Sequence, residues 1–209
     1  MRTARSETHA ATTNTARRAA AAHVLPLDSV LLRDALARRP VRAPNIHAEN
    51  AAYLALAHQL AVGPGGFLQT LMDVTVSLCD AGTAGISLLE TRADGEEQFR
   101  WTVLAGRMAS HVNGTTPREF SPCGTCLDHG GPVLFAYPER RFTYFAAAGV
   151  PFVEGLVLPF HVGGVTAGTI WIVSHDTSRR FDLEDVRIMT RLARFAGDAY
   201  AMLSRQTLS

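Results

Sequence analysis

The sequence has few of the features that assign a chain to a specialised class of protein. None of its apolar runs reaches the roughly 20 uninterrupted residues that a membrane span requires. It holds 20 basic and 19 acidic residues, which gives a net charge of +1 and no large basic face for nucleic acid. Its three cysteines are odd in number, which argues against a secreted disulfide framework. These absences predict a protein of the reducing cytoplasm that binds neither membranes nor nucleic acid.

The first 45 residues differ in composition from the rest of the chain. Residues 1–22 are rich in Ala, Thr and Arg and lack the apolar stretch of a secretory signal. Their composition resembles an organellar transit peptide, although a disordered tail of a bacterial protein explains it better. Leucines at helical spacing then predict a short helix at residues 27–37. We therefore expect a flexible extension over residues 1–45 that contains this one helix.

From residue 46 to residue 205 the hydrophobic pattern is that of one globular domain. The expected elements are helices at 48–60 and 67–79, a hairpin of strands 85–91 and 98–104, an insertion at 106–155, a hairpin of strands 156–162 and 166–174, and a helix that Asp182 opens. This order predicts the α+β class, with a central antiparallel sheet. The N- and C-terminal helices are expected on one face, and the long insertion is expected to form a pocket on the other.

Two of the three cysteines stand at C-x-x-C spacing inside the insertion. Ser121 is a good N-cap and Pro122 suits the first helical position, so a helix is expected to begin there. Cys123 then lies in the first turn, where free N–H groups and the helix dipole favour a thiolate. Cys126 follows one turn later on the same face. The two cysteines could form a redox-active pair, bind a metal ion or line the wall of a ligand pocket.

Several short motifs of this domain occur in a characteristic combination. They are Ala84-Gly85-Ile86-Ser87-Leu88-Leu89, Gly114-Thr115-Thr116-Pro117, Phe120-Ser121-Pro122-Cys123-Gly124, Pro138-Glu139-Arg140, Leu158-Pro159-Phe160-His161-Val162-Gly163-Gly164 with Gly168-Thr169-Ile170-Trp171, and Arg180-Phe181-Asp182-Leu183-Glu184-Asp185. Over about residues 46–203 they resemble the GAF domain family, and specifically the GAF modules near the N-termini of bacterial sensor histidine kinases. The resemblance implies the GAF fold and a signal-receiving module with a small-ligand pocket between the sheet and the insertion.

The resemblance leaves the ligand and the chemistry open, because GAF domains host cyclic nucleotides, bilins, haem, nitrate and a free methionine sulfoxide reductase activity. That reductase, or a thiol redox sensor, is the alternative function here. Cys123 would attack, Cys126 would resolve the disulfide, and Asp128 or Glu154 would hold the substrate amino group. The cysteine motifs and spacing of that reductase family are absent, and relatives are expected to carry an aliphatic residue at position 126. A noncatalytic role is therefore the favoured one.

Two kinds of cofactor, zinc and a tetrapyrrole, fit parts of the sequence, and neither is favoured. Cys123, Cys126 and His129 offer three zinc ligands, but the sequence holds no second ligand pair of the usual spacing. A covalently bound bilin is disfavoured because neither cysteine of the motif is followed directly by His. A noncovalent haem bound through His129 or His161 remains open. The sequence thus leaves the cofactor unknown.

The expected ligand site combines aromatic residues of the strands and the insertion with the start of the cysteine helix. Its candidates are Phe99, Trp101, Phe120, Ser121, Cys123, Cys126, His129, Tyr144, Phe145, Phe160 and Trp171. No catalytic residue is assigned in the favoured interpretation.

The last helix carries two apolar stripes. One comprises Val186, Met189, Ala193, Ala196, Tyr200 and Leu203, and the other comprises Ile188, Leu192, Phe195, Ala199 and Met202. One helix cannot bury both stripes on one sheet, so we expect one stripe to join the first domain helix in a bundle between two protomers. The sequence therefore predicts a bacterial sensor module that binds a small ligand and signals through the terminal helices of a homodimer, with a separate kinase or regulator as a further partner.

Overall fold

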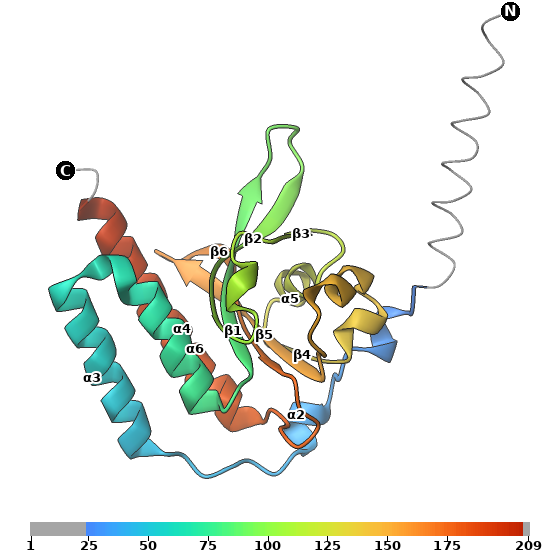
Figure 1. Ribbon diagram of the computed structural model, residues 1–209, viewed down its shortest axis with the longest axis horizontal. Coiled ribbons are helices and arrows are strands. Elements are labelled where there is room, and N and C mark those ends of the chain that lie inside the picture. The colour runs from blue at the N-terminus through green and yellow to red at the C-terminus, as the bar shows by residue number, and fades with distance from the viewer. Residues whose placement is uncertain (1–23, 207–209) are drawn as a thin grey trace, which may run out of the picture.

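The computed structural model describes residues 24–206 (Figure 1). Its helices are α2 (Ala35–Arg38), α3 (Ile46–Val62), α4 (Phe67–Cys79), α5 (Pro122–His129) and α6 (Leu183–Gln206). Its strands are β1 (Thr83–Thr91), β2 (Glu97–Gly106), β3 (Thr115–Pro117), β4 (Val133–Ala136), β5 (Glu154–Val162) and β6 (Val165–Ser174). The 3₁₀ turns are η1 (Leu27–Ser29), η2 (Pro64–Gly66), η3 (Ala109–His111), η4 (Pro138–Arg140) and η5 (Thr143–Ala148). In this part of the chain, no helix is both long and apolar enough to cross a bilayer.

The strands form one antiparallel sheet in the order β3-β2-β1-β6-β5-β4. Helices α4 and α6 pack on one face with α3 outside them, and α5 with the turns of the insertion covers the other face (Figure 1). Each face buries its own hydrophobic cluster. The predicted α+β architecture is confirmed.

The ends of the helices follow from local capping chemistry. The Oδ1 atom of Asn45 accepts a hydrogen bond from the Ala48 amide at 3.1 Å and so caps α3. Helix α4 ends at Asp80, whose left-handed φ of 45° lets the chain turn back into the sheet. Asp182 accepts hydrogen bonds from the amides of Glu184 and Asp185 at 2.8 and 3.2 Å, as its predicted role at the start of α6 requires.

Part of the segment that precedes α3, which we expected to be a flexible extension, pairs with the domain at residues 30–32. The Leu32 amide donates to the Leu134 carbonyl, and the Ala136 amide donates to the Val30 carbonyl, each at 2.8 Å. The expected helix at 27–37 is replaced by η1, an extended stretch and the short α2. The reason is that β4 is an edge strand whose free backbone groups pair with this stretch. The composition-based interpretation of residues 1–22 concerns positions outside the described residues.

Both apolar stripes of α6 are covered largely within the same chain. Met189 and Ala193 of the first stripe and Leu192 of the second are buried in the cluster between the helices and the sheet. The ring of Phe195 lies 5.8 Å from that of Tyr53 in α3, edge to face. The second stripe thus joins α3 of its own protomer, where we expected a bundle between protomers. The Leu203 side chain lies outside the described residues.

Candidate functional site

The cysteine helix α5 begins as its sequence predicts. Ser121 is the N-cap, its Oγ accepts a hydrogen bond from the Gly124 amide at 2.9 Å, and Pro122 occupies the first turn. A Cβ atom at Gly124 would stand 1.9 Å from the carbonyl oxygen of Arg118, so this position requires glycine. The helix N-terminus is therefore closed off by the preceding backbone and by its own cap.

The two thiols of this helix are buried, and this overturns the expectation of a thiolate at Cys123. Cys123 is only 6% exposed, and its Sγ lies 3.7 Å from the Oγ of Ser87 in β1. Burial raises the pKa of the Cys123 thiol above its usual value, although hydrogen bonds to the sulfur oppose that change. Burial likewise raises the pKa of Cys126, whose Sγ lies 3.4 Å from the carbonyl oxygens of Gly131 and Val157. Both thiols are therefore protonated at neutral pH.

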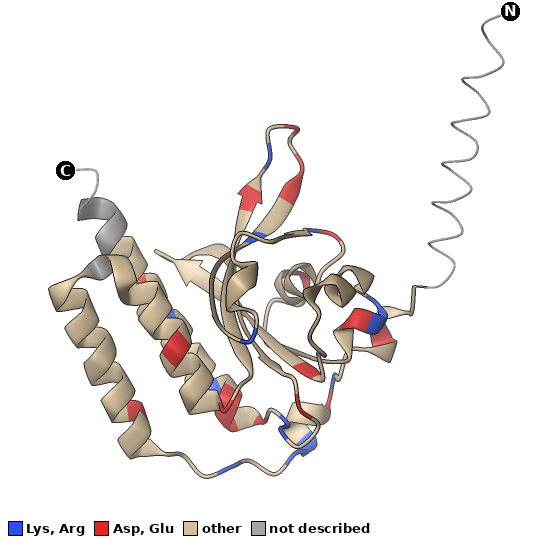
Figure 2. Cartoon of the chain, in the orientation of Figure 1, with Lys and Arg blue, Asp and Glu red and all other residues tan. Residues whose placement is uncertain are grey.

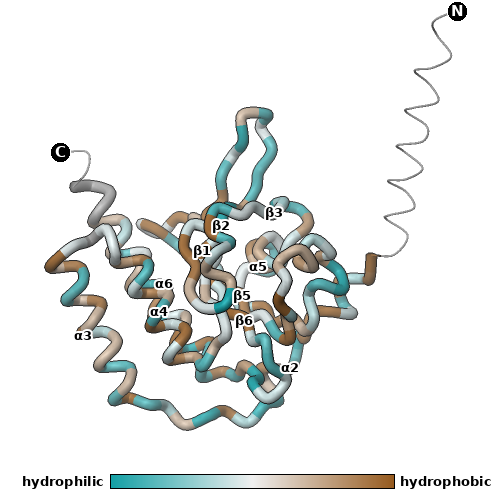
Figure 3. Tube along the Cα trace, viewed as in Figure 1, coloured by the Kyte–Doolittle hydropathy of each residue, from teal (hydrophilic) through white to brown (hydrophobic). Residues whose placement is uncertain are grey.

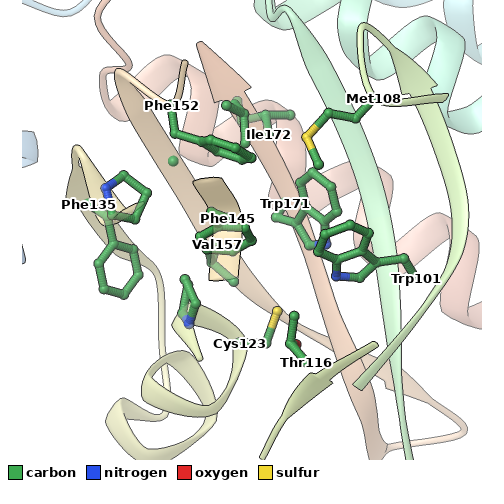
Figure 4. Close-up of a pocket in the computed structure, with 14 residues that line it drawn as sticks. Trp101, Met108, Thr116, Cys123, Phe135, Phe145, Phe152, Val157, Trp171 and Ile172 are labelled. Carbon is green, nitrogen blue, oxygen red and sulfur yellow. The ribbon is translucent and has the colours of Figure 1, made fainter. Parts of the chain in front are cut away.

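A pocket lies between the sheet and the insertion, and its cavity has a volume of about 40 Å³ (Figure 4). Its lining consists of Trp101, Met108, Thr116, Pro122, Cys123, Phe135, Pro138, Phe145, Phe152, Gly155, Val157, Trp171, Ile172 and Val173. None of these residues carries a charged side chain. The apolar, aromatic lining is typical of a small-molecule site. The cavity has room for about three water molecules, so a larger occupant requires the lining side chains to move.

Aromatic rings form the centre of the pocket. The rings of Trp101 and Phe145 are nearly parallel, with 6.2 Å between their centroids. Trp171 meets Trp101 edge to face at 6.0 Å, and Phe152 lies 4.7 Å from Phe145. These rings come from β2, η5, β6 and the loop before β5, so the sheet and the insertion each supply part of the enclosure.

The polar groups of the site gather around Cys123. The Nε1–H of Trp171 donates a hydrogen bond to the Oγ of Ser87 at 2.8 Å, which fixes the indole ring. The Thr116 side chain is only 3% exposed, and its hydroxyl interacts with that of Tyr144, although neither hydroxyl has a hydrogen bond of ordinary geometry within residues 24–206. Burial raises the pKa of the Tyr144 phenol, and the Thr116 hydroxyl opposes this change. Buried hydroxyls without such a hydrogen bond are costly, so they mark a place where a ligand atom gains binding energy.

The structure gathers most of the predicted site residues on the pocket side of the sheet. Trp101, Cys123, Phe145 and Trp171 line the pocket itself. Phe99, Phe120, Cys126 and Tyr144 belong to the hydrophobic cluster around it, and Ser121 caps the helix below.

Two predicted residues lie elsewhere. Phe160 is buried on the opposite face, in the cluster beneath the helices. Along β5, Leu156, Leu158 and Phe160 face the helices, whereas Val157 faces the pocket, so the two-residue period of the strand already separates them. His129 is exposed at the end of α5.

The zinc alternative has no support in the arrangement of these side chains. Among the described residues, no group of three or more His, Cys, Asp or Glu side chains is placed to hold a metal ion. The sulfur of Cys123 contacts a serine hydroxyl, that of Cys126 contacts backbone carbonyls, and His129 faces solvent.

Sequence reasoning missed several residues that line the pocket. Phe152 follows a Gly-Val-Pro turn that carries no periodic signal, and Met108 lies in a loop. Thr116 is different, because it stands between exposed neighbours in β3 within a motif that already carried the family resemblance. The sequence therefore contained information that could have predicted the inward position of Thr116.

A family model described as GAF domain matches residues 61–200, so the chain belongs to the GAF domain family. No curated protein matches the sequence significantly.

Solved GAF structures share the fold. The GAF domain of a phosphoenolpyruvate-protein phosphotransferase from Coxiella burnetii has a TM-score of 0.64 at 13% identity, covering 79% of this chain and 99% of its own. The free methionine-R-sulfoxide reductase of Neisseria meningitidis, solved with its substrate, has a TM-score of 0.61 at 18% identity, covering 81% and 97%. The GAF-B domain of DevS from Mycobacterium smegmatis has a TM-score of 0.54 at 20% identity, covering 69% and 97%. At these identities the likeness establishes the fold alone.

Proposed function

We propose that this chain is a noncatalytic GAF sensor or regulatory module. Its small ligand binds in the pocket between the sheet and the insertion, and its terminal helices pass the signal on within a homodimer. The observation that carries this proposal is the uncharged aromatic pocket with the buried Thr116 side chain in its lining. The predictions of a bacterial source, a cytoplasmic location and a separate kinase or regulator partner rest on the sequence alone and stay predictions.

The state of the thiols favours binding over redox catalysis. A cysteine that attacks a sulfoxide or a disulfide does so as an accessible thiolate. Cys123 and Cys126 are instead buried, and their burial raises both pKa values. The redox alternative therefore needs an opening of α5 before any reaction.

A chain of contacts links the pocket to α6. Gly155 lines the pocket, and the carboxylate of its neighbour Glu154 is fully buried. This carboxylate accepts hydrogen bonds from the Phe181 amide at 3.1 Å and from Arg180 at 3.0 Å, immediately before α6. A shift of the first residues of β5 on ligand binding is thereby transmitted to the start of the C-terminal helix.

The outer face of α3 is the proposed dimer surface. Leu54 near the middle of α3 is 72% exposed, and Ile46 and Val62 at its two ends are 52 and 65% exposed. The single Asp, Glu, Lys or Arg of α3 is Glu49, which is buried and pairs with Arg187 of α6 (Figures 2 and 3). An apolar face without charges is suited to packing against the same face of a second copy.

Native mass spectrometry of the protein as purified from cells tests the ligand part of this proposal. A Cβ atom at Gly155 meets nothing within 4 Å, so Gly155→Val fills the pocket without a clash at Cβ. We expect the wild-type chain to retain a small added mass that Gly155→Val loses. The control Gly65→Val, at a turn position that is equally open, keeps it. The same added mass in all three proteins, or none in any of them, would contradict the proposed function.

A further inference from the structure

A second concavity lies at the open half of strand β5, away from the aromatic pocket. The edge strand β4 pairs only with residues 154–157, so in the described part of the chain no strand covers the outer edge of residues 158–162. Helix α6 and the turn after α5 flank this open edge and leave a groove with a volume of about 470 Å³. The groove shares no lining residue with the aromatic pocket, so it is a separate candidate site.

Glycines keep the walls of this groove open. Gly130, Gly131, Gly163 and Gly164 line it, and a Cβ atom at any of them would meet nothing within 4 Å. Gly130, Gly163 and Gly164 have φ values of 73°, 58° and 82°, a region that favours glycine. Gly131 has no such φ, so its backbone tolerates a side chain. A side chain at Gly131 therefore narrows the groove without backbone strain.

The floor of the groove is apolar. Leu158 of β5 and Ala193 of α6 are 3 and 8% exposed, and the rings of Pro132 and Pro159 add to the lining. Pro159 also has no backbone N–H, and a proline at an open sheet edge disfavours the addition of a further strand. The groove is therefore better suited to a small molecule than to an extended peptide.

Two opposite charges of α6 border the groove without a partner. Arg194 and Asp198 lie one helical turn apart, and both side chains are exposed. Among the described side chains, neither takes part in a hydrogen bond or an ion pair, not even with the other. Arg187 and Arg191 of the same helix are, by contrast, bound to Glu49. The groove thus offers one free cation and one free anion to a ligand.

These two charges favour a ligand that carries both signs. Side chains four positions apart on a helix have Cβ atoms about 5–6 Å apart, which places both groups within reach of the ammonium and carboxylate of one small molecule. A carboxylate alone would be attracted by Arg194 and repelled by Asp198, and an amine alone the reverse. His161, the remaining titratable residue of the lining, adds no negative charge.

We infer that this groove binds a free α-amino acid with an apolar side chain. Its carboxylate binds Arg194, its ammonium group binds Asp198, and its side chain packs on Leu158 and Ala193. The site is additional to the aromatic pocket, so it goes beyond the proposed function. Because both charged groups belong to α6, its occupant contacts directly the helix that is proposed to carry the signal.

Calorimetric titration of the full-length protein with leucine tests this inference. Isocaproate is leucine without the ammonium group, and isopentylamine is leucine without the carboxylate, so the three probes share one apolar body. Leucine is expected to bind at least about fivefold more tightly than either analogue, because each analogue loses one charge-assisted contact and keeps one repulsion.

Five variants locate the bound leucine. With Arg194→Gln we expect leucine to bind no more tightly than isopentylamine, and with Asp198→Asn no more tightly than isocaproate. Arg191→Gln removes a guanidinium outside the groove and is expected to keep the preference for leucine. Gly131→Val is expected to weaken leucine binding at least about tenfold, whereas Gly65→Val, at an equally open position outside the groove, leaves it unchanged. Melting curves that match the wild type show that each variant is folded.

The contrary results separate this site from the aromatic pocket. A wild-type protein that does not bind leucine at millimolar concentrations overturns the inference, and so does leucine binding that Arg194→Gln and Asp198→Asn leave unchanged. Leucine binding that is lost in Gly155→Val and kept in Gly131→Val would place the amino acid in the aromatic pocket, which overturns the inference and supports the proposed function. The proposed function itself is judged independently, by the mass retained in the native spectrum.

Discussion

The guanidinium group of Arg39 binds the carboxylate of Glu154 through two hydrogen bonds, from Nη2 to Oε1 at 2.6 Å and from Nη1 to Oε2 at 2.9 Å. The two residues are 115 positions apart in the sequence. Arg39 also donates to the carbonyl of Phe181 at 2.7 Å, so one side chain ties the N-terminal segment to β5 and to the start of α6. The segment before α3 is therefore part of the folded domain.

Arg39→Ala is expected to lower the free energy of unfolding by about 2 kcal/mol, because it leaves a fully buried carboxylate with fewer partners. Arg180 and the Phe181 amide still bind Glu154, which keeps the loss below that of an isolated buried charge. Urea denaturation measures the change.

The neighbouring Arg38 is the control for that measurement. Its ion pair with Asp34 is exposed on both sides, so Arg38→Ala is expected to cost at most about 0.5 kcal/mol. Equal effects of the two substitutions would show that the Arg39 contact is not part of the stable fold.

Leu54→Glu is expected to weaken the dimer at least tenfold. Two charged side chains would then face each other where two leucines were buried, and each buried leucine contributes roughly 1.5 kcal/mol or more. Sedimentation or light scattering over a concentration series measures the dissociation constant. Val165 is equally exposed, at 71%, but lies at a hairpin turn, so Val165→Glu should leave the dimer intact. A wild-type protein that is monomeric at tens of micromolar would refute the dimer.

The Cys123 thiol is expected to react slowly with an alkylating reagent. A variant with Cys79→Ala and Cys126→Ala keeps only this thiol and gives an unambiguous rate. Because Cys123 is buried and its pKa is raised, we expect alkylation at least about hundredfold slower in the folded protein than in urea. Rapid native alkylation that titrates below about 8.5, the ordinary cysteine pKa, would instead favour the redox alternative.

Stability is expected to fall as the pH falls through the range in which His175 titrates. The Nδ1–H of His175 donates to the Pro151 carbonyl, and its Nε2 accepts from the Thr83 hydroxyl at 2.8 Å. Burial lowers the pKa of His175 below 6.5; the Pro151 carbonyl opposes this effect, and Arg107 adds to it. The unfolded chain therefore binds this proton first, so the stabilisation is complete above about pH 6.5 and is lost below it.

Unfolding in urea at a series of pH values between about 5 and 7.5 measures this dependence. His175→Asn keeps a donor for the Pro151 carbonyl but cannot titrate, so its stability should vary less over the same range. An unchanged slope in that variant would assign the dependence to other groups.

The comparison of sequence and structure separates local from nonlocal information. The caps at Ser121 and Asp182, the hairpins and the ends of α4 depend on neighbouring residues, and the sequence pattern predicts them well. The pairing of residues 30–32 with β4 depends on an edge strand about 100 positions away, which leucine spacing alone cannot reveal.

The same distinction explains the errors at the site. A helix N-terminus favours a thiolate, but the burial of Cys123 under the sheet depends on the tertiary structure and outweighs that effect. The coverage of α6 by α3 is likewise a tertiary contact, made by Tyr53 and Phe195. Phe160 is an exception, because the alternation along β5 already placed it opposite Val157.

The most direct test of the central claim, that the pocket is the ligand site, is a ¹H–¹⁵N spectrum of the two tryptophan indole groups. Both Trp101 and Trp171 line the pocket, so any molecule that enters it changes their environment. On addition of a low-molecular-mass fraction of cell extract to protein refolded free of any retained molecule, we predict that the indole signals of the wild-type protein shift and that those of Gly155→Val stay in place. Backbone signals that shift elsewhere while both wild-type indole signals remain unchanged would contradict the account.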